Sequence, residues 1–376
     1  MRRNPSHPDR PLHALTLPPG PRLFEAVTAA LSGEGPAVLP LPPGMDPGPL
    51  RPTHVDGVRQ ADGEGVPPDV AVVIATSGST GTPKGVQLSA QALRTSAAAS
   101  LRRLGAAKGE RWLCCLPPSH VSGLQVLVRS ILAEAEPIIH ERFDPVAVLE
   151  SGATHVSLVP TQLHRLVAMN ADLSVFGTVL LGGAAPMPGL LAEARALGAR
   201  VVTTYGMSET SGGCVYDGRP LYNVDLKIGD DGRILISGPV LFSGYRFGEP
   251  YDGGWFATSD LGELTGGRLR VLGRADDVIN TGGEKVVAAS VAAVLARHPE
   301  VADVAVVGTP DPEWGEAVTA FVVPADQSRP PTLQQLRAYA ADRLPPYAAP
   351  RELRILSALP LLANGKTDMA ALRTGT

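Results

Sequence analysis

Apolar runs typical of buried strands alternate with helical patterns from residue 69 onward. VAVVIA at 70–75 predicts a buried strand, and Ser89 is placed to cap a helix that runs to about Leu104. The same alternation predicts strands at 111–116, 137–140, 156–160, 178–183 and 199–206, with helices at 122–133, 161–168 and 188–197. Buried strands that alternate with helices form βαβ units, so we expect a largely parallel sheet.

The two ends of the chain have different patterns. Residues 1–68 are rich in proline and predict only a helix at 22–31 and a strand at 37–41. From Tyr222, short strands broken by Gly and Asp-Gly turns suggest an antiparallel or barrel-like subdomain. After Arg274 the pattern predicts helices at 288–297 and 332–344 and strands at 301–308 and 317–324.

These patterns predict an α/β fold with two domains. We expect a large N-terminal domain over residues 1–275, built of βαβ sheets and the small barrel-like subdomain. A small, mobile α+β domain would follow over residues 276–376.

Composition narrows the class of protein. With 376 residues, 44% of them hydrophobic, the chain can bury a large core, and a net charge of −4 argues against a nucleic-acid partner. No apolar run reaches the ~18 residues that span a membrane, and the basic N-terminus precedes no apolar stretch of a secretory signal. Cys114, Cys115 and Cys214 match neither a disulfide framework nor a zinc site, so we expect a cytoplasmic protein.

The strongest chemical signal directly follows the strand at 70–75. TSGSTGTPKG, at Thr76–Gly85, combines three glycines, five hydroxyl side chains and Lys84, one of only five lysines in the chain. Such a loop lets backbone N–H groups, hydroxyls and a positive charge surround a phosphate. Lys84 is neither preceded by Gly nor followed by Ser or Thr, which excludes a Walker A loop. The predicted phosphate-binding residues are Thr76, Ser77, Gly78, Ser79, Thr80, Gly81, Thr82 and Lys84.

TSGSTGTPKG resembles the phosphate loop of the adenylate-forming enzymes, a family of acyl- and aryl-CoA synthetases, adenylation domains and luciferases. Six segments resemble further motifs of that family, in the same order: LPPSHVSG (116–123), GGAAP (182–186), TTYGMSETSG (203–212), GWFATSDLG (254–262), GRADDVINTGGEKV (273–286) and PLLANGKTD (360–368). Ser208 stands where the family has Thr, and Ser259 where Gly is usual. Only 75 residues precede the phosphate loop, fewer than in typical members, so we expect a shortened N-terminal region.

The resemblance implies a two-step reaction that uses ATP, Mg²⁺ and CoA. A carboxylate attacks the α-phosphate of ATP to give an acyl-adenylate and pyrophosphate, and a thiol then attacks the acyl carbon, which forms the thioester and releases AMP. Because two anions meet in the first step, positive groups are needed where charge develops. By resemblance, Lys366 is the mobile catalytic cation and Glu209 is the Mg²⁺ ligand. One carboxylate is enough because Mg²⁺ keeps several waters.

The resemblance also assigns contacts to the nucleotide and to CoA. Asp260 would accept hydrogen bonds from the ribose hydroxyls with Arg274 in support, and Tyr205 would stack on the adenine. Asp276 matches the hinge between the adenylating and thioester-forming poses. The other predicted ATP-binding residues are Gly182, Gly183, Ala184, Thr204, Gly206, Met207 and Ser208. The predicted CoA-binding residues are Gly282, Gly283 and Lys285, with a solvated surface lysine as the alternative for Lys285.

Two segments indicate the acid. SLVPTQLHRL (157–166) and HVSGLQVLVRS (120–130) resemble the 2-succinylbenzoate–CoA ligases of menaquinone synthesis. That acid has a second carboxylate, which needs a cationic or hydrogen-bonding partner in an apolar pocket. His120 lies beside the acyl pocket in the family pattern, as a catalytic and substrate candidate, while Arg129 and Arg165 are either cations for the second carboxylate or structural residues. Further acyl-pocket candidates are Gly123, Ser157, Ser122 and Thr161, the last two with helix capping as the alternative.

Three alternatives stay open at this point. The chain could activate another acid, or it could be a stand-alone adenylation enzyme that loads a carrier-protein thiol. The sequence contains no helix opening on Asp-Ser-Leu of the kind that marks a carrier protein, which favours free CoA. A non-catalytic nucleotide-binding relative is disfavoured because Lys366, Glu209 and Asp260 are all present. We expect small-molecule partners, an acid with ATP and CoA, and leave open a monomer or a homodimer.

Overall fold

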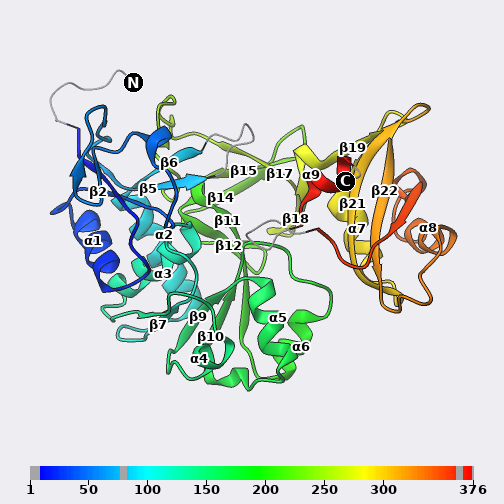
Figure 1. The fold of residues 1–376 in the computed structure, drawn as a ribbon, viewed down its shortest axis with the longest axis horizontal. Helices are drawn as coiled ribbons and strands as arrows, with labels where there is room; N and C mark the ends of the chain where they lie inside the picture. Colours follow the sequence, from blue (N-terminus) through cyan, green and yellow to red (C-terminus); the bar gives the residue numbers. More distant parts are fainter. Residues whose placement is uncertain (1–8, 77–82, 361–366, 375–376) are drawn as a thin grey trace. The chain divides into compact units, whose positions relative to one another are not determined.

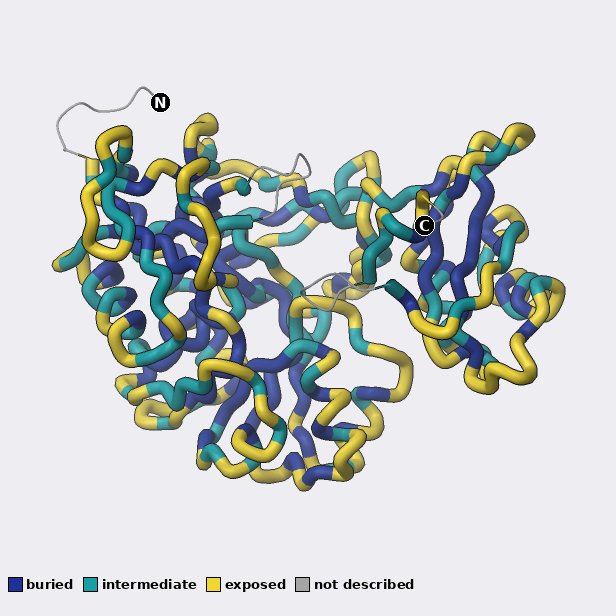
Figure 2. The backbone as a smooth tube through the Cα atoms, viewed as in Figure 1, coloured by how far each residue is buried: buried dark blue, intermediate teal, exposed yellow. Residues whose placement is uncertain are grey.

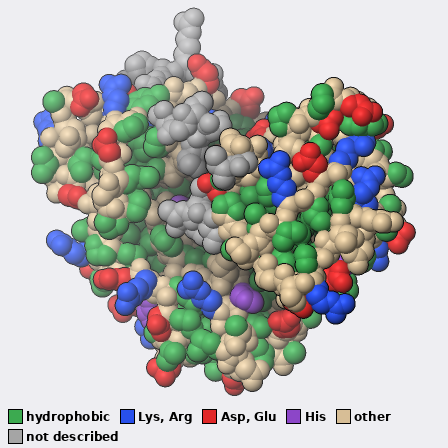
Figure 3. Space-filling view, turned by 45° about the vertical axis from the view of Figure 1, so that its right-hand side comes forward, with side chains coloured by type: hydrophobic (Ala, Val, Ile, Leu, Met, Phe, Trp, Pro, Cys, Tyr) green, Lys and Arg blue, Asp and Glu red, His purple; other side chains and the backbone are tan. Residues whose placement is uncertain are grey.

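The computed structural model describes residues 9–76, 83–360 and 367–374. It confirms the expected mixed α/β class (Figure 1). Two compact units are present, the first made of Met1–Leu226 and Ile236–Phe256 and the second of Lys227–Leu235 and Ala257–Thr376. In the described residues, no helix combines the length and the apolar character needed to cross a membrane. Figure 3 shows acidic and basic side chains interspersed on one face of the molecule.

The first sheet contains the strands on either side of the predicted phosphate loop. Its strands are, in spatial order, β16 (Gly244–Tyr245), β6 (Lys84–Ser89), β5 (Val70–Thr76), β2 (Ala37–Pro40), β1 (Leu12–Leu15), β3 (His54–Val55) and β4 (Val58–Arg59). The predicted strand at 70–75 is confirmed as β5, whose first five residues are buried. We did not predict β6, which pairs antiparallel with β5 and buries Val86 and Leu88.

The second sheet matches the predicted βαβ pattern. Its strands are, in order, β13 (Arg219–Pro220), β12 (Gly212–Tyr216), β11 (Val201–Met207), β10 (Thr178–Leu181), β9 (His155–Leu158), β7 (Trp112–Cys114) and β8 (Ile138–Ile139). The neighbouring strands β11, β10, β9, β7 and β8 are parallel, as expected. On the other side of β11, β12 pairs with it in the antiparallel direction. Figure 2 shows the strands of this sheet as mainly buried.

Helices of the first unit cover these sheets. They are α1 (Pro21–Ser32), α2 (Ala90–Leu104), α3 (Val121–Leu132), α4 (Pro145–Leu149), α5 (Pro160–Ala168) and α6 (Leu190–Ala196). As predicted, Ser89 caps α2, since its hydroxyl accepts from the backbone N–H of Ala92 at 3.0 Å. Leu163 and Leu166 of α5 and Leu190 of α6 pack into the core that the second sheet forms with these helices.

The second unit contains the C-terminal α+β pattern. A five-stranded sheet consists of β20 (Glu284–Val287), β19 (Val278–Thr281), β22 (Gly315–Pro324) and β21 (Val301–Asp311), with β23 (Glu352–Ile355) paired to β22. Its helices are α7 (Ala288–Leu295), α8 (Leu333–Ala341) and α9 (Met369–Thr374). A separate four-stranded sheet, formed where we expected an antiparallel or barrel-like subdomain, has the order β14 (Asp225–Ile228), β15 (Arg233–Ser237), β17 (Phe256–Thr265), β18 (Arg268–Arg274).

The compact units do not divide at Asp276. The second unit includes β18 and all of β17 except its first residue, which precede Asp276, and α7 contacts β18. The boundary at residues 275 and 276 therefore stays a prediction about a hinge. This boundary differs from the boundaries of the two compact units, which follow the contacts between residues.

Candidate active site

Four of the predicted motifs follow the carboxyl ends of adjacent parallel strands. The segment ending at His120 follows β7, Thr161 follows β9, Gly182 follows β10, and Glu209 follows β11. Because the strands β7, β9, β10 and β11 are neighbours in one sheet, these segments emerge along the same edge. Ligands of open α/β sheets bind at this edge.

Glycines allow two motifs to approach closely: the adenine loop, GGAAP at 182–186, which resembles the family's loop against the adenine, and the tyrosine motif, TTYGMSETSG at 203–212. Gly182 donates its N–H to the carbonyl of Leu158 at 3.1 Å. An added Cβ there would lie 2.3 Å from Oγ1 of Thr204 on the neighbouring strand β11. Ala184 and Gly183 come next, and Gly183 has a φ of +86° that favours glycine. The loop predicted to contact adenine is thus held against β11.

The tyrosine motif occupies the end of β11. Thr204, Tyr205, Gly206 and Met207 lie on this strand, and Ser208 and Glu209 continue into a short 3₁₀ turn at Ser208–Thr210. The hydroxyl of Thr210 accepts from the N–H of Met207 at 2.9 Å, which closes the turn. The position of Glu209 is therefore set by β11 and by this local cap.

Thr76 and Lys84 lie opposite each other at the ends of β5 and β6. The two residues are register partners, and the Thr76 hydroxyl donates to the Lys84 carbonyl at 3.2 Å. The intervening predictions Ser77, Gly78, Ser79, Thr80, Gly81 and Thr82 lie outside the described residues. The hairpin thus brings the two ends of the predicted phosphate loop together.

Glu209 and Lys84 share a partner that the sequence did not reveal. The hydroxyl of Tyr245 donates to Oε1 of Glu209 at 2.8 Å, and Nζ of Lys84 lies 5.6 Å from the centre of the Tyr245 ring. Burial, together with the neighbouring Glu209 carboxylate, raises the pKa of Tyr245 above its ordinary value, so the phenol keeps its proton. The only signal for Tyr245 was a Gly-Tyr pair in a region of short strands.

The surroundings of Glu209 fit a magnesium ligand. The carboxylate is half-buried, and only its Oε1 has a hydrogen bond among the contacts of the described residues. In the same part of the chain, no group of three or more His, Cys, Asp and Glu could enclose a metal ion. Mg²⁺ that is bound with a nucleotide typically uses one or two carboxylates beside phosphate oxygens and water. A partly buried carboxylate with one oxygen outside the hydrogen bonds of the described residues suits that chemistry.

The acyl-pocket candidates begin at α3. His120 is exposed and lies at the N-cap position of α3, but its side chain makes no capping bond. The helix begins one residue before Ser122, so capping by Ser122 is wrong. An added Cβ at Gly123 would lie 2.4 Å from the carbonyl oxygen of Pro117, so the turn before α3 packs onto the helix only because residue 123 is glycine.

Capping by Thr161 is also wrong. α5 begins at Pro160, and the exposed Thr161 is its second residue. The N-cap is Val159, whose N–H donates to the side chain of Gln162 at 3.2 Å. Helix capping therefore does not occupy the hydroxyl groups of Thr161 and Ser122.

The two arginine candidates lie in opposite environments. Arg129 is only 4% exposed, donates to the hydroxyl of Ser157 at 2.9 Å, and has its guanidinium carbon 4.3 Å from the centre of the Trp112 ring. Its Nε is buried without a partner, and burial lowers its pKa from the ordinary value. Arg165 is exposed on α5. The structure thus brings together Arg129 and Ser157 but not Arg165.

The second unit brings together the predicted ribose pair. Asp260 on β17 and Arg274 on β18 are register partners. Nη2 of Arg274 also lies 3.3 Å from Oδ2 of Asp276, the predicted hinge residue, in an exposed ion pair. Next to it, Asp277 pairs with Arg373 of α9 at 2.6 Å. The predicted catalytic residue Lys366 lies outside the described residues.

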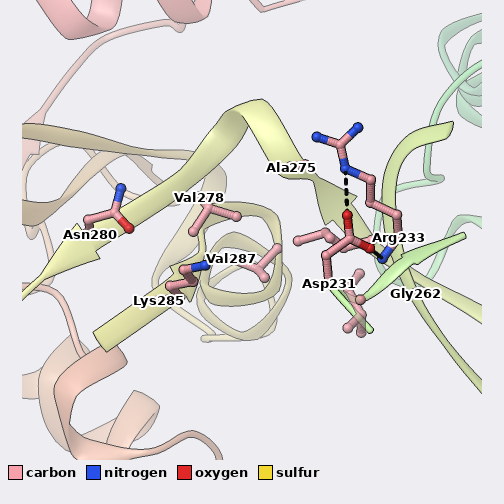
Figure 4. Close-up of a pocket in the computed structure, with 11 residues that line it drawn as sticks. Asp231, Arg233, Gly262, Ala275, Val278, Asn280, Lys285 and Val287 are labelled. Carbon is pink, nitrogen blue, oxygen red and sulfur yellow. Dashed lines mark hydrogen bonds and ion pairs between the residues drawn. The ribbon is translucent and has the colours of Figure 1, made fainter. Parts of the chain in front are cut away.

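Gly282 and Gly283 form the turn between β19 and β20. Their φ values of +60° and +84° are those that glycine adopts readily. Lys285 follows on β20 and, with Arg233, Leu261, Val278 and other residues, lines a hollow of about 470 Å³ (Figure 4). The lining residues come from both sides of Asp276 in the sequence.

Comparison with known proteins places the chain in a family. Residues 44–246 match the model described as "AMP-binding enzyme", and residues 290–366 match "AMP-binding enzyme C-terminal domain". A Mycobacterium tuberculosis protein named "Probable 2-succinylbenzoate--CoA ligase" is 44% identical over 96% of this chain and 97% of its own length.

Solved structures agree with the sequence comparison. The o-succinylbenzoate CoA synthetase of Bacillus subtilis in complex with the acyl-adenylate intermediate OSB-AMP has a TM-score of 0.80 and 29% identity, covering 98% of this chain and 88% of that chain. The same enzyme in complex with ATP and a magnesium ion has a TM-score of 0.81 and 29% identity, covering 98% and 90%. The motifs, the fold and the matched models agree, and the chain belongs to the AMP-binding enzyme family.

Proposed function

We propose that this protein is an ATP-dependent 2-succinylbenzoate–CoA ligase that works through an acyl-adenylate. The observation that carries the proposal is the 44% identity, over nearly the whole of both chains, to a relative with that name. The B. subtilis structures named above, with an acyl-adenylate and with ATP and magnesium, support the intermediate and the cofactors. A homodimer and a cytoplasmic location stay predictions.

The first unit would bind the triphosphate and the acid. We assign the phosphates to the hairpin that joins Thr76 to Lys84, and the adenine to the loop after β10 and to Tyr205. Glu209 would hold Mg²⁺, which, when bound, neutralises charge on the phosphates. The loop after β10, Tyr205 and Glu209 follow or end neighbouring strands of the second sheet, and Tyr245 contacts both Lys84 of the hairpin and Glu209, which supports the assignment.

The second unit would bind the ribose and take part in thioester formation. Asp260 would accept from the ribose hydroxyls, with its register partner Arg274 beside it. We assign CoA to the Gly282–Gly283 turn and Lys285, with Asp276 as hinge. The hollow beside Lys285 supports this role because residues before and after Asp276 line it, and rotation at Asp276 would reshape it.

Pyrophosphate release from a panel of acids tests the function. We expect release with 2-succinylbenzoate that requires both ATP and Mg²⁺, and thioester formation when CoA is added. Simple benzoates and fatty acids serve as the comparison acids. Release with those acids but not with 2-succinylbenzoate would contradict the substrate. Thioester formed on a carrier protein but not on CoA would contradict the acceptor.

We propose Arg129, rather than Arg165, as the cation for the second carboxylate. Burying a charged group without an ionic partner is costly, and none of the ion pairs in the described part of the chain includes the buried Arg129. A bound carboxylate would supply that partner, with the Ser157 hydroxyl beside it.

Arg129→Leu is therefore expected to raise the KM for 2-succinylbenzoate by at least about tenfold, the effect of losing a charge-assisted hydrogen bond worth ~1.5–3 kcal/mol. The KM for ATP should change by less than about threefold. Initial rates of pyrophosphate release at varied acid concentration measure the effect. The matched control is Arg165→Leu, at an exposed arginine on α5, which should leave both constants nearly unchanged. An unchanged KM in folded Arg129→Leu would make Arg129 structural.

A further inference from the structure

We propose that Tyr245 is a positioning residue that holds Glu209 ready for Mg²⁺ and keeps it apart from Lys84. This inference rests on the proposed function, because it concerns the metal of the ATP reaction. Tyr245 lies 36 residues after Glu209 in the sequence, on β16 at the edge of the first sheet. No sequence motif pointed to it.

Two hydrogen bonds tie Glu209 to the segment that carries Tyr245. The Tyr245 hydroxyl donates to Oε1 of Glu209 at 2.8 Å, and the N–H of Phe242 donates to the Glu209 carbonyl at 2.9 Å. Both the side chain and the backbone of Glu209 are therefore oriented by residues 242–245. Oε2 of Glu209 is left to meet a cation.

The ring of Tyr245 is itself held in place. Tyr245 pairs with Val86 in the register of β16 and β6, and its ring lies edge-on to Phe242, with the centroids 5.0 Å apart. Phe242 in turn stacks on Tyr251 at 5.3 Å and contacts Phe256 at 5.2 Å. A phenol on a ring fixed in this way points in one direction, so the hydrogen bond can orient the carboxylate.

Tyr245 also separates two opposite charges. Nζ of Lys84 lies 5.6 Å from the ring centre of Tyr245, and the hydroxyl of the same ring contacts Glu209. None of the ion pairs among the described residues joins Lys84 to Glu209, although both residues are described. A direct pair would occupy the carboxylate that the metal needs and the ammonium that the phosphates need. The aromatic ring engages Lys84 through its π face and Glu209 through its hydroxyl, so both charges stay available.

The expected size of the effect follows from how metal ligands are supported. Hydrogen bonds that orient a ligating carboxylate commonly change metal affinity by about 10–100-fold when they are lost. Mg²⁺ is demanding because it requires near-ideal octahedral geometry. Phenylalanine at position 245 would keep the ring contacts with Phe242 and Lys84 but could not donate to Glu209.

The test measures ATP binding calorimetrically as a function of Mg²⁺ concentration, with no acid present. Tyr245→Phe is expected to raise the Mg²⁺ concentration for half-maximal enhancement of ATP binding by about tenfold or more. ATP binding without Mg²⁺ and the thermal unfolding midpoint should stay close to wild type. The control is Tyr251→Phe, which removes the hydroxyl of a tyrosine in the same aromatic cluster whose hydroxyl contacts Gly254 instead. Its Mg²⁺ dependence should match wild type.

Combination with Glu209→Gln separates positioning from a general structural effect. If Tyr245 acts through the carboxylate, Tyr245→Phe should add less than about twofold in the Glu209→Gln background. Equal effects of Tyr245→Phe in both backgrounds, or an unchanged Mg²⁺ dependence, would overturn the inference alone. Wild-type protein that binds ATP without any influence of Mg²⁺ would overturn the metal role of Glu209 as well. If ATP binding depends on Mg²⁺ as expected but 2-succinylbenzoate gives no pyrophosphate release, only the proposed substrate is contradicted.

Discussion

Lys366→Ala is expected to slow formation of the acyl-adenylate by at least about 100-fold, the usual cost of removing a group that stabilises developing charge. Thioester formation from supplied acyl-adenylate and CoA should remain largely intact. The reason is that only the first step joins two anions, the carboxylate and the α-phosphate, at a site where Lys366 is the implied mobile cation. Pyrophosphate release measures the first step, and consumption of synthetic acyl-adenylate with CoA measures the second.

A surface lysine provides the control for this prediction. Lys108 pairs with Glu134 at 2.5 Å, with side chains 70% and 63% exposed, so Lys108→Ala should leave both steps unchanged. The proposed mechanism uses Lys366 in the adenylating pose and not in the thioester-forming pose. Equal loss of both steps in Lys366→Ala would contradict it. Normal adenylation by Lys366→Ala would remove the residue from catalysis.

The parts of the fold that the sequence predicted are those decided by local patterns. The apolar run of β5 and the cap at Ser89 are local features, and both are confirmed. The short strand β6 was missed because only two apolar residues alternate in it, behind a Gly/Ser/Thr loop that gives no strand signal. Its existence depends on pairing with β5, which is a property of the folded chain.

The candidate site shows the same division. The candidate residues that follow β7, β10 and β11 could be predicted from the motifs and their order, because glycine and charged residues at fixed spacing mark these motifs in the sequence. Motif order could not show that Tyr245 contacts Glu209, since that contact joins residues far apart in the chain. Nor could it distinguish Arg129 from Arg165, because both lie in helical patterns with apolar residues nearby and only tertiary packing buries one of them.

Gly206→Ala is expected to damage both folding and nucleotide binding. An added Cβ at Gly206 would lie 2.1 Å from the carbonyl oxygen of Gly212 and 2.7 Å from Cα of Gly213, both backbone atoms of β12. Because backbone cannot swing aside as a side-chain tip can, β11 and β12 would have to separate, at a cost of ~1–3 kcal/mol. Tyr205 and Glu209 lie on either side of the disturbed point, so kcat/KM for ATP should fall by up to about 100-fold. Urea unfolding and initial rates at varied ATP measure the two effects.

A second glycine tests whether the close approach is the cause. Gly20 precedes α1 with a φ of 174°, and an added Cβ there would meet only the carbonyl oxygen of Pro18, at 3.8 Å. Gly20→Ala should therefore change the free energy of unfolding by less than about 1 kcal/mol and leave ATP kinetics unchanged. If Gly206→Ala were as stable and as active as Gly20→Ala, contact between β11 and β12 would not set the position of the tyrosine motif. If Gly206→Ala lost ATP affinity but kept the free energy of unfolding of the wild type, β11 and β12 would separate without destabilising the core. The substitution would then distort only the nucleotide site.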